Sequence, residues 1–325
     1  MGPHHVICQD MPQLLSAYRF IDLAKLPLLR ERLKVKAAEL DLVGTVLLAE
    51  EGINFSLGGS REALDAWLEY LDAAHGIDQL VSNWVSVDCV PFLRLRVRIR
   101  PEIITFDPAL KPGQAPTGQA LKPEDWHALL QREEVQLVDT RNHYEYEIGS
   151  FRGAVDPAIE TFTDFRDWAL EHLQTDRPVA MFCTGGVRCE KASAWLLANG
   201  YDQVFQLEGG ILNYLRDIPA EQSLWQGECY VFDDRIAVDH DLKPTGRLIC
   251  AACSRPVEGL GADGMPPINA QRDCGLCGQQ FETRRLAGLR ERVRQIALAR
   301  KRGQAHLGPK SQPEAAQRKQ EYSSL

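Results

Sequence analysis

One short segment combines the residue types that stabilise and use a sulfur anion. Cys183 follows four apolar residues, 179–182, and precedes a stretch with helical periodicity, 191–199. These patterns predict a buried strand, a tight loop and a helix. A cysteine in such a loop faces the backbone N–H groups of the helix N-terminus, which favour the thiolate. The sequence therefore predicts a reactive thiolate at Cys183 rather than a small apolar residue packed at the end of a strand.

The residues after Cys183 favour the same chemistry. Paired glycines let the backbone curl around a group bound to sulfur, and Arg188 adds a fixed positive charge. We interpret Cys183 and Arg188 as the catalytic residues. Cys189 is either a second reactive thiol or a residue packed on the helix. Besides the catalytic pair, the predicted active loop contains Thr184, Gly185, Gly186, Val187 and Cys189.

The elements expected around this loop define an α/β multi-domain protein. Residues 1–106 follow the order β-α-β-β-α-β, which predicts an N-terminal ferredoxin-like α+β domain. Residues 107–120 are rich in Pro, Gly and Lys and are predicted to be a linker. Residues 121–218 alternate apolar strands with helices, which predicts a parallel sheet covered on both faces. Reactive groups in such sheets lie at the carboxyl ends of strands, where Cys183 falls.

Residues 219–325 differ in composition and contain two C-x2-C pairs that are separated by 20 residues. Four thiolates can close one tetrahedral shell, which predicts a structural zinc site. Coincidental pairs or labile disulfides are the alternative. A basic helix is expected over about 283–301, followed by a disordered polar tail. The predicted zinc ligands are Cys250, Cys253, Cys274 and Cys277.

The bulk composition limits the class of protein. The chain has 325 residues, of which 44% are hydrophobic, enough for two or three cores. It has no apolar run of the 18 or more residues that span a bilayer, and no apolar signal-peptide core is visible. Nine cysteines, four of them in metal-type pairs, do not suggest a disulfide framework. We therefore expect a cytoplasmic protein that does not bind a membrane.

Positive charge is concentrated in two places although the net charge is −8. Residues 278–325 contain 11 Lys/Arg and 4 Asp/Glu. Residues 93–100 alternate apolar residues with arginines, which places the arginines on one face of a strand. Each surface either contacts a phosphate backbone or is a solvated face. The candidate RNA-binding residues are Arg94, Arg96, Arg98, Arg290 and Arg294.

The segment 183–188 resembles the six-residue active loop of a rhodanese-like domain. In that superfamily a six-residue loop suits sulfur transfer, whereas a seven-residue loop suits phosphatase chemistry. The surrounding blocks agree with this resemblance, and they are residues 137–141, 149–154 and 207–211.

The match is closer to one family, the bacterial tRNA uridine hydroxylases often called TrhO. The similar blocks are residues 51–54, 139–142, 145–149, 183–193 and 227–235. This resemblance implies an oxygen-dependent enzyme that converts the tRNA wobble uridine to 5-hydroxyuridine, with the anticodon loop as its partner. Asp139 and Arg141 would then position Arg188 and bind a phosphate or the base. Glu145 would carry a proton or form an ion pair.

Two other functions remain open from the residues alone. The same loop would serve a sulfurtransferase that carries a persulfide on Cys183. A non-catalytic tRNA-binding adaptor is the third possibility, although an intact Cys183 and Arg188 argue against it. The sequence identifies neither an electron donor for a hydroxylase nor an oligomeric state. Four aromatic residues near the loop are candidates for stacking on a base, and they are Tyr144, Tyr146, Phe162 and Phe165.

Overall fold

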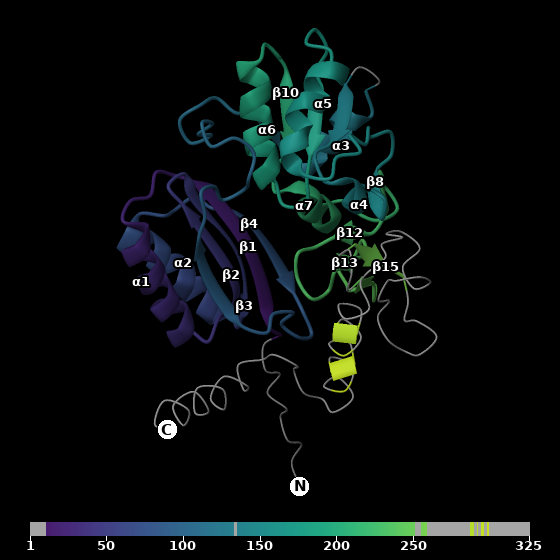
Figure 1. Cartoon of the computed structure of the whole chain (residues 1–325). Coiled ribbons are helices and arrows are strands. Elements are labelled where there is room, and N and C mark those ends of the chain that lie inside the picture. The colour runs from purple at the N-terminus through teal and green to yellow at the C-terminus, as the bar shows by residue number, and fades with distance from the viewer. Residues whose placement is uncertain are drawn as a thin grey trace, which may run out of the picture. The chain divides into compact units, whose positions relative to one another are not determined.

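The computed structural model describes residues 11–132, 135–250 and 255–258, together with positions 287, 288, 291, 294, 295 and 298. The chain divides into two compact units. The larger comprises Met1–Val231 with Val238–Lys243, and the smaller comprises Phe232–Ala237 with Pro244–Leu325. The larger unit contains both α/β domains that the sequence predicts, and Figure 1 labels most of their elements.

The N-terminal domain consists of β1 Gln13–Phe20, α1 Leu26–Glu39, β2 Val43–Ala49, β3 Gly52–Gly59, α2 Arg61–His75, β4 Val81–Ser86 and β5 Leu95–Ile99. The predicted β-α-β-β-α-β order is therefore present, with one additional strand. The sheet has the order β4-β1-β3-β2-β5. Its first four strands pair antiparallel, whereas β5 lies parallel to β2.

The two faces of this sheet differ because alternate side chains of a strand point to opposite faces. One face packs against α1 and α2, and its hydrophobic core includes Leu15, Phe55 and Trp67. The opposite face is polar, and its Ser16 and Ser56 hydroxyls lie 2.6 Å apart. The sheet thus offers one polar face that no helix of its own domain covers.

The second domain consists of β6 Gln119–Leu121, α3 Pro123–Leu130, β7 Gln136–Asp139, α4 His143–Tyr146, β8 Gly149–Phe151, η1 Phe162–Asp164, α5 Phe165–His172, β9 Val179–Phe182, α6 Val187–Ala198, β10 Val204–Leu207 and α7 Gly210–Asp217. Its sheet has the order β6-β10-β9-β7, and all of its pairs are parallel. The predicted parallel sheet is confirmed.

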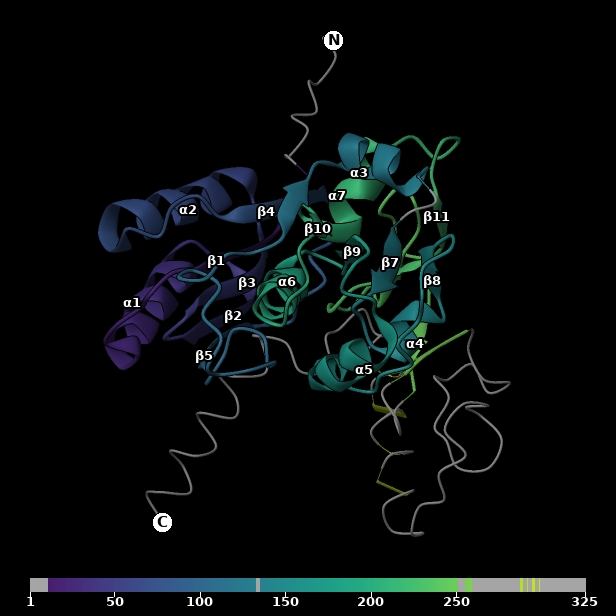
Figure 2. The same cartoon turned by 90° about the horizontal axis from the view of Figure 1, so that it is seen from above.

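Period-two alternation along β9 builds both cores of this domain. Ala180 and Phe182 pack with α3 and α7, whereas Val179 and Met181 pack with α5 and α6. A parallel strand that is covered on both faces needs such a continuous apolar run. Figure 2 shows the sheet between these two pairs of helices. Cys183 continues the alternation and belongs to the cluster on the α5 and α6 side.

Two parts of the second domain differ from the sequence prediction. β6 begins at Gln119, inside the segment that the sequence predicts to be a linker, and pairs with β10. Phe106, at the predicted end of the first domain, stacks on Phe162 of the second domain with their ring centroids 4.4 Å apart. The chain therefore joins the second domain before its first strand, through side-chain packing that periodicity does not report.

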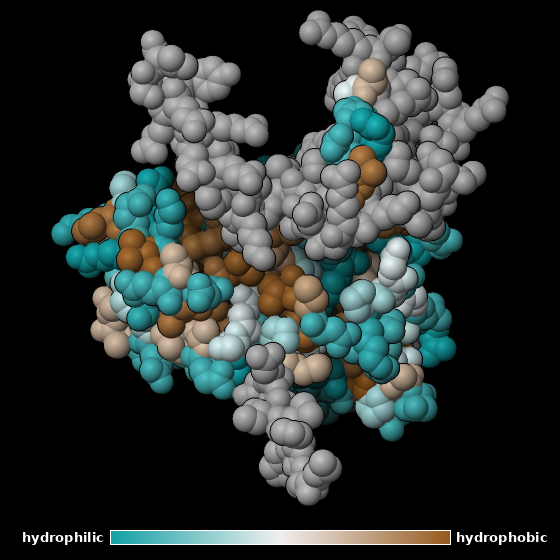
Figure 3. Space-filling view, turned by 90° about the horizontal axis from the view of Figure 1, so that it is seen from below, coloured by the Kyte–Doolittle hydropathy of each residue, from teal (hydrophilic) through white to brown (hydrophobic). Residues whose placement is uncertain are grey.

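The remaining strands are short and are β11 Trp225–Gly227, β12 Cys229–Tyr230, β13 Ala237–Val238, β14 Leu248–Ile249 and β15 Pro256–Val257. Among the residues with described coordinates, no helix is both long and apolar enough to cross a membrane. The described surface seen from below carries many hydrophilic side chains around a central band of hydrophobic ones (Figure 3).

Candidate functional site

The Cys183 side chain lies at the carboxyl end of β9, enclosed by the loop that leads into α6. The sulfur accepts a hydrogen bond from the Gly186 N–H at 3.1 Å. Gly186 has φ 97°, a left-handed conformation that suits glycine and turns its N–H towards the sulfur. The loop is fixed from behind because the Ile211 N–H donates to the Cys183 carbonyl at 2.9 Å. Cys183 itself is only 1% exposed.

The surroundings of Cys183 stabilise its thiolate. Burial by itself raises the pKa of this thiol. A hydrogen bond from Cys189, the charge of Arg188 and the backbone N–H groups of both residues outweigh burial, and they lower the pKa from 9.0 to about 6. At neutral pH the sulfur is therefore mostly ionised, which is the reactive form of a cysteine. Buried among apolar side chains alone, the thiol would have stayed protonated.

Cys189 is the protonated member of the two thiols. Burial, the hydrogen bond to Cys183 and the negative charge of Cys183 together raise the pKa of Cys189 well above its usual value. Its sulfur also lies 3.7 Å from Thr140 Oγ1, whose hydroxyl donates to the Phe182 carbonyl at 2.9 Å. Cys189 is fully buried. Because its thiol keeps its proton, it donates a hydrogen bond to the Cys183 sulfur.

Arg188 is held beside the active loop by Glu145. Its Nη1 donates to Glu145 Oε2 at 2.6 Å, and its Nη2 donates to Oε1 at 3.0 Å. Glu145 is fully buried, and the Asn142 N–H donates to its Oε2 at 3.0 Å. Burial opposes the charge of Arg188, but Glu145 and the Cys183 thiolate raise the pKa of Arg188. Of the two roles predicted for Glu145, the structure shows the ion pair.

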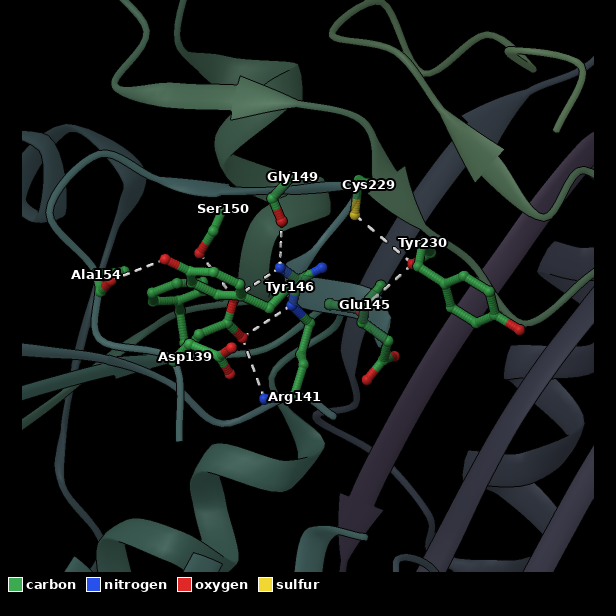
Figure 4. Close-up of polar contacts among 12 residues, drawn as sticks. Asp139, Arg141, Glu145, Tyr146, Gly149, Ser150, Ala154, Cys229 and Tyr230 are labelled. Atoms are coloured by element: carbon green, nitrogen blue, oxygen red, sulfur yellow. Dashed lines mark hydrogen bonds and ion pairs between the residues drawn. The ribbon is translucent and has the colours of Figure 1, made fainter. Parts of the chain in front are cut away.

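Asp139 and Arg141 do not position Arg188, contrary to the expectation from the sequence. They pair with each other, with Arg141 Nε donating to Asp139 Oδ1 at 2.8 Å and Nη2 to Oδ2 at 2.6 Å. Ser150 Oγ donates to Asp139, and Arg141 also donates to the Gly149 carbonyl (Figure 4). Both charged side chains are completely buried. Neither can bind a phosphate or a base here, because solvent does not reach them.

The four aromatic candidates for base stacking separate into two groups. Phe162 and Phe165 belong to the hydrophobic core and are unavailable to a base. Tyr146 is half-buried and donates to the Ala154 carbonyl at 3.3 Å. Tyr144 is also half-buried and packs edge-on against Tyr230, with ring centroids 5.3 Å apart. Burial and the charge of Glu145 raise the pKa of Tyr144, and Tyr144 stays the candidate of the four that lies next to Glu145 in the sequence.

A buried lysine on α6 was not predicted as part of the site. Lys191 is fully buried, and its Nζ lies 2.8 Å from Glu51 Oε2 and 2.5 Å from Glu102 Oε1. Both carboxylates come from the N-terminal domain and the segment after it, so they attach α6 to that domain. In the sequence, Glu51 and Lys191 occur in two of the blocks that resemble the family. The sequence assigned no role to either residue.

The predicted RNA-binding and zinc residues are described only in part. The side chains of Arg94, Arg96 and Arg98 are exposed, while Leu95, Val97 and Ile99 pack towards the core, so the predicted alternation is present. Arg294 is exposed and pairs with Glu291. Arg290 lies outside the described residues. So do three of the predicted zinc ligands, Cys253, Cys274 and Cys277.

The zinc site therefore stays a prediction. Cys250, the one ligand that the structure describes, is buried. Within the described part of the chain, no group of three or more His, Cys, Asp or Glu residues could hold a metal ion. Four thiolates would give a closed tetrahedral shell, which serves folding rather than catalysis.

The parallel sheet, the cysteine at the end of β9 and the six-residue loop define a rhodanese-type domain. Residues 122–217 match the family model of the rhodanese-like domain. Residues 12–103 match that of the UPF0176 acylphosphatase-like domain. This combination is the domain architecture of the TrhO/UPF0176 family, which is the family that the sequence motifs resemble.

Solved structures resemble single domains of the chain. A rhodanese-like domain from Anabaena sp. is 22% identical over 33% of this chain and 78% of its own, with a TM-score of 0.29. A rhodanese-like domain protein from Staphylococcus aureus is 27% identical over 30% of this chain and 90% of its own, with a TM-score of 0.26. An acylphosphatase from Coxiella burnetii is 23% identical over 27% of this chain and 92% of its own, with a TM-score of 0.20.

Proposed function

We propose that this protein is a tRNA-modifying enzyme that hydroxylates the wobble uridine to 5-hydroxyuridine, with dioxygen as co-substrate and a two-electron donor that reduces the second oxygen atom to water. One observation carries the proposal. The Cys183 thiol, with its pKa lowered to about 6, lies in a six-residue rhodanese loop of a chain that also has the UPF0176 domain. A sulfur carrier needs only the rhodanese domain, so the additional domain favours a larger substrate. We further propose that the protein acts in the cytoplasm.

The residues around Cys183 have defined tasks in this proposal. The thiolate is the nucleophile that attacks or holds the base. The N–H of Gly186 and the positive charge of Arg188 stabilise negative charge that develops at the sulfur. Glu145 fixes the direction of the Arg188 guanidinium. The exposed arginines of β5 are suited to the phosphate backbone, which strong positive charge attracts without regard to sequence.

Nucleoside mass spectrometry tests this function in cells. Total tRNA from a strain that lacks the protein is expected to lose 5-hydroxyuridine, and the wild-type chain should restore it. Cys183→Ser should not restore it, because serine is not ionised at neutral pH and cannot replace the thiolate. Cys89→Ser is the matched control, since Cys89 is an exposed free cysteine in the N-terminal domain. Restoration by Cys183→Ser would remove the thiolate from the mechanism.

Sulfur transfer is the second candidate, and the loop length favours it. In that reaction the thiolate would take a sulfane sulfur from thiosulfate, releasing sulfite, and pass it to an acceptor such as cyanide. Purified protein should then form thiocyanate at a rate that depends on Cys183. Rapid thiocyanate formation together with unchanged tRNA nucleosides in the deletion strain would favour the sulfurtransferase over the hydroxylase.

A further inference from the structure

The polar face of the N-terminal sheet lies against the active loop and α6. Two side chains of this face form hydrogen bonds to the second domain. Asn83 Nδ2 on β4 donates to the Gly209 carbonyl at 3.1 Å. Tyr18 Oη on β1 donates to Glu190 Oε1 at 3.3 Å. In Figure 2 the sheet accordingly lies between its own helices and α6.

Tyr18 is placed beside the residue that holds the sulfur. A β-carbon at position 186 would lie only 2.9 Å from Tyr18 Oη, so the Tyr18 hydroxyl lies directly over Gly186. The N–H of this same Gly186 donates to the Cys183 sulfur. The absence of a side chain at position 186 therefore leaves room for the Tyr18 hydroxyl above the thiolate.

Asn83 brings an unsatisfied acceptor to the same place. It is 4% exposed, and among the residues that the structure describes none donates a hydrogen bond to its Oδ1. A β-carbon at position 185 would lie 4.0 Å from its Nδ2. Buried carbonyl oxygens are rarely left without a donor, because losing water costs free energy that a hydrogen bond must offset. A ligand N–H would supply the missing donor.

The electrostatics suit Tyr18 as a donor. Burial, followed by the negative charges of Glu190 and Cys183, raises the pKa of Tyr18 well above its usual value. The hydroxyl therefore keeps its proton next to an anionic sulfur. Phenol hydroxyls that keep their proton can donate to a substrate oxygen, as they do in oxyanion holes.

An ion cluster of Lys191, Glu51 and Glu102, called the Lys191 cluster below, joins α6 to the N-terminal domain. Lys191 lies on α6, three residues after Arg188, and it joins Glu51 and Glu102 in a buried ion cluster. Separating these charges without replacement partners is strongly unfavourable. The position of the N-terminal sheet relative to α6 is therefore fixed by buried charges as well as by the two hydrogen bonds of Tyr18 and Asn83.

We propose that the active site is built from both domains, with Tyr18 and Asn83 of the N-terminal sheet contacting the group that reacts at Cys183. Tyr18 turns its hydroxyl proton from Glu190 Oε1 to a carbonyl oxygen of that group, and Asn83 Oδ1 accepts a hydrogen bond from its N–H. A flat heterocycle with a carbonyl next to an N–H, as in uracil, has this pattern. The inference rests on the proposed chemistry at Cys183. Because Cys183 is 1% exposed, entry of a base requires the Tyr18 side chain to turn away from the loop, while the Lys191 cluster holds the sheet in place.

The first test measures whether the N-terminal sheet covers the thiolate, and it needs no substrate. Tyr18→Ala in the full chain should speed alkylation of Cys183 by iodoacetamide at pH 8 about tenfold, since it removes the ring that closes the loop. Trypsin cleaves after Arg188, so Cys183 and Cys189 are quantified on separate peptides. Tyr70→Ala, on the helix-covered side of the same domain, is the control. Equal alkylation rates in Tyr18→Ala and Tyr70→Ala would overturn the inference.

The second test isolates the polar groups. Tyr18→Phe keeps the ring and should leave Cys183 alkylation within twofold of wild type. It should nevertheless lower the rate of 5-hydroxyuridine formation about tenfold or more, because one hydrogen bond to developing charge is worth about that factor. Tyr201→Phe removes another buried tyrosine hydroxyl, which donates to the Ala169 carbonyl, and is the control for lost stability. Asn83→Ala should also lower the rate, relative to Asn199→Ala.

The two possible failures are distinguishable. If the wild-type chain forms no 5-hydroxyuridine, the proposed function fails, and Tyr18→Phe is compared with wild type in thiocyanate formation instead. If wild type and Tyr18→Phe react equally fast in whichever reaction the wild type catalyses, the two-domain site is wrong. If neither reaction occurs, the alkylation of Tyr18→Ala decides.

Discussion

The Asp139–Arg141 and Glu145–Arg188 pairs are both buried and both joined by two hydrogen bonds between their side chains, yet their surroundings differ. Arg141 additionally donates to Gly149 and lies 5.1 Å from the centroid of the Trp225 ring. Arg188 instead lies beside the active loop, and its charge lowers the pKa of the Cys183 thiol. The first pair supports the turn after β7, whereas the second transmits charge to the sulfur.

This difference shows why a buried arginine next to a catalytic loop is not by itself a catalytic residue. Arg141 has its charge neutralised by a carboxylate two residues away and has no solvent contact. Arg188 comes from α6, and its carboxylate partner comes from α4, so the pair connects two elements at the loop. Only the arginine whose charge reaches the sulfur changes the chemistry there.

The largest expected effect is on stability. Arg141→Met leaves Asp139 buried without its counter-charge and should lower the free energy of unfolding by about 3–5 kcal/mol. Arg188→Met likewise leaves Glu145 buried without its counter-charge. The loss of stability should be smaller, because the Arg188 side chain is 9% exposed in the wild type. Urea unfolding monitored by tryptophan fluorescence measures both. A loss below about 1 kcal/mol for Arg141→Met would contradict the structural role of the first pair.

Replacing both members of each buried ion pair with neutral residues tests which pair influences the pKa of Cys183. Arg188→Met with Glu145→Gln should raise the pKa of Cys183 by about 1–2 units, since the thiolate loses its nearest positive charge. Alkylation of Cys183 at pH 6.5 should slow about tenfold. Arg141→Met with Asp139→Asn is the matched control and should leave the midpoint of the pH profile at about 6. A shift of equal size in both double variants would show that the two pairs act alike.

A smaller effect of opposite sign is expected when only the carboxylate of the second pair is removed. Glu145→Gln leaves the charge of Arg188 uncompensated, which stabilises the thiolate further. The pKa of Cys183 should fall below about 6, by about one unit or less. The alkylation midpoint measures this shift, and Glu147→Gln, on an exposed neighbour, is the control. An upward shift would mean that Glu145 influences the sulfur by some route other than Arg188.

The sequence predicted the strand before Cys183, the helix after it and the parallel sheet, because each of these has a regular apolar pattern. β6 and β8 were not predicted, since three residues are too few to show period-two alternation.

The partners of the charged residues could not be predicted in the same way. Periodicity shows which face of an element is buried, but it does not show which distant element meets that face. Glu145 and Arg188 are 43 residues apart, and Tyr18 and Glu190 are 172 apart. The sequence therefore identified the thiolate and its loop but assigned Arg188 to Asp139 and Arg141, its neighbours on the next strand end, and it gave Tyr18 no role.

The smallest expected effect concerns arginines whose charge faces solvent. Arg94, Arg96 and Arg98 on and beside β5 are exposed, unlike Arg141 and Arg188. Changing these three to glutamate should leave Cys183 alkylation and urea stability almost unchanged. It should weaken tRNA binding and reduce the salt dependence of the affinity, since each lost phosphate contact lowers the logarithmic slope by about 0.7–0.9. An unchanged slope would assign the β5 arginines to solvation and leave tRNA binding to another basic surface.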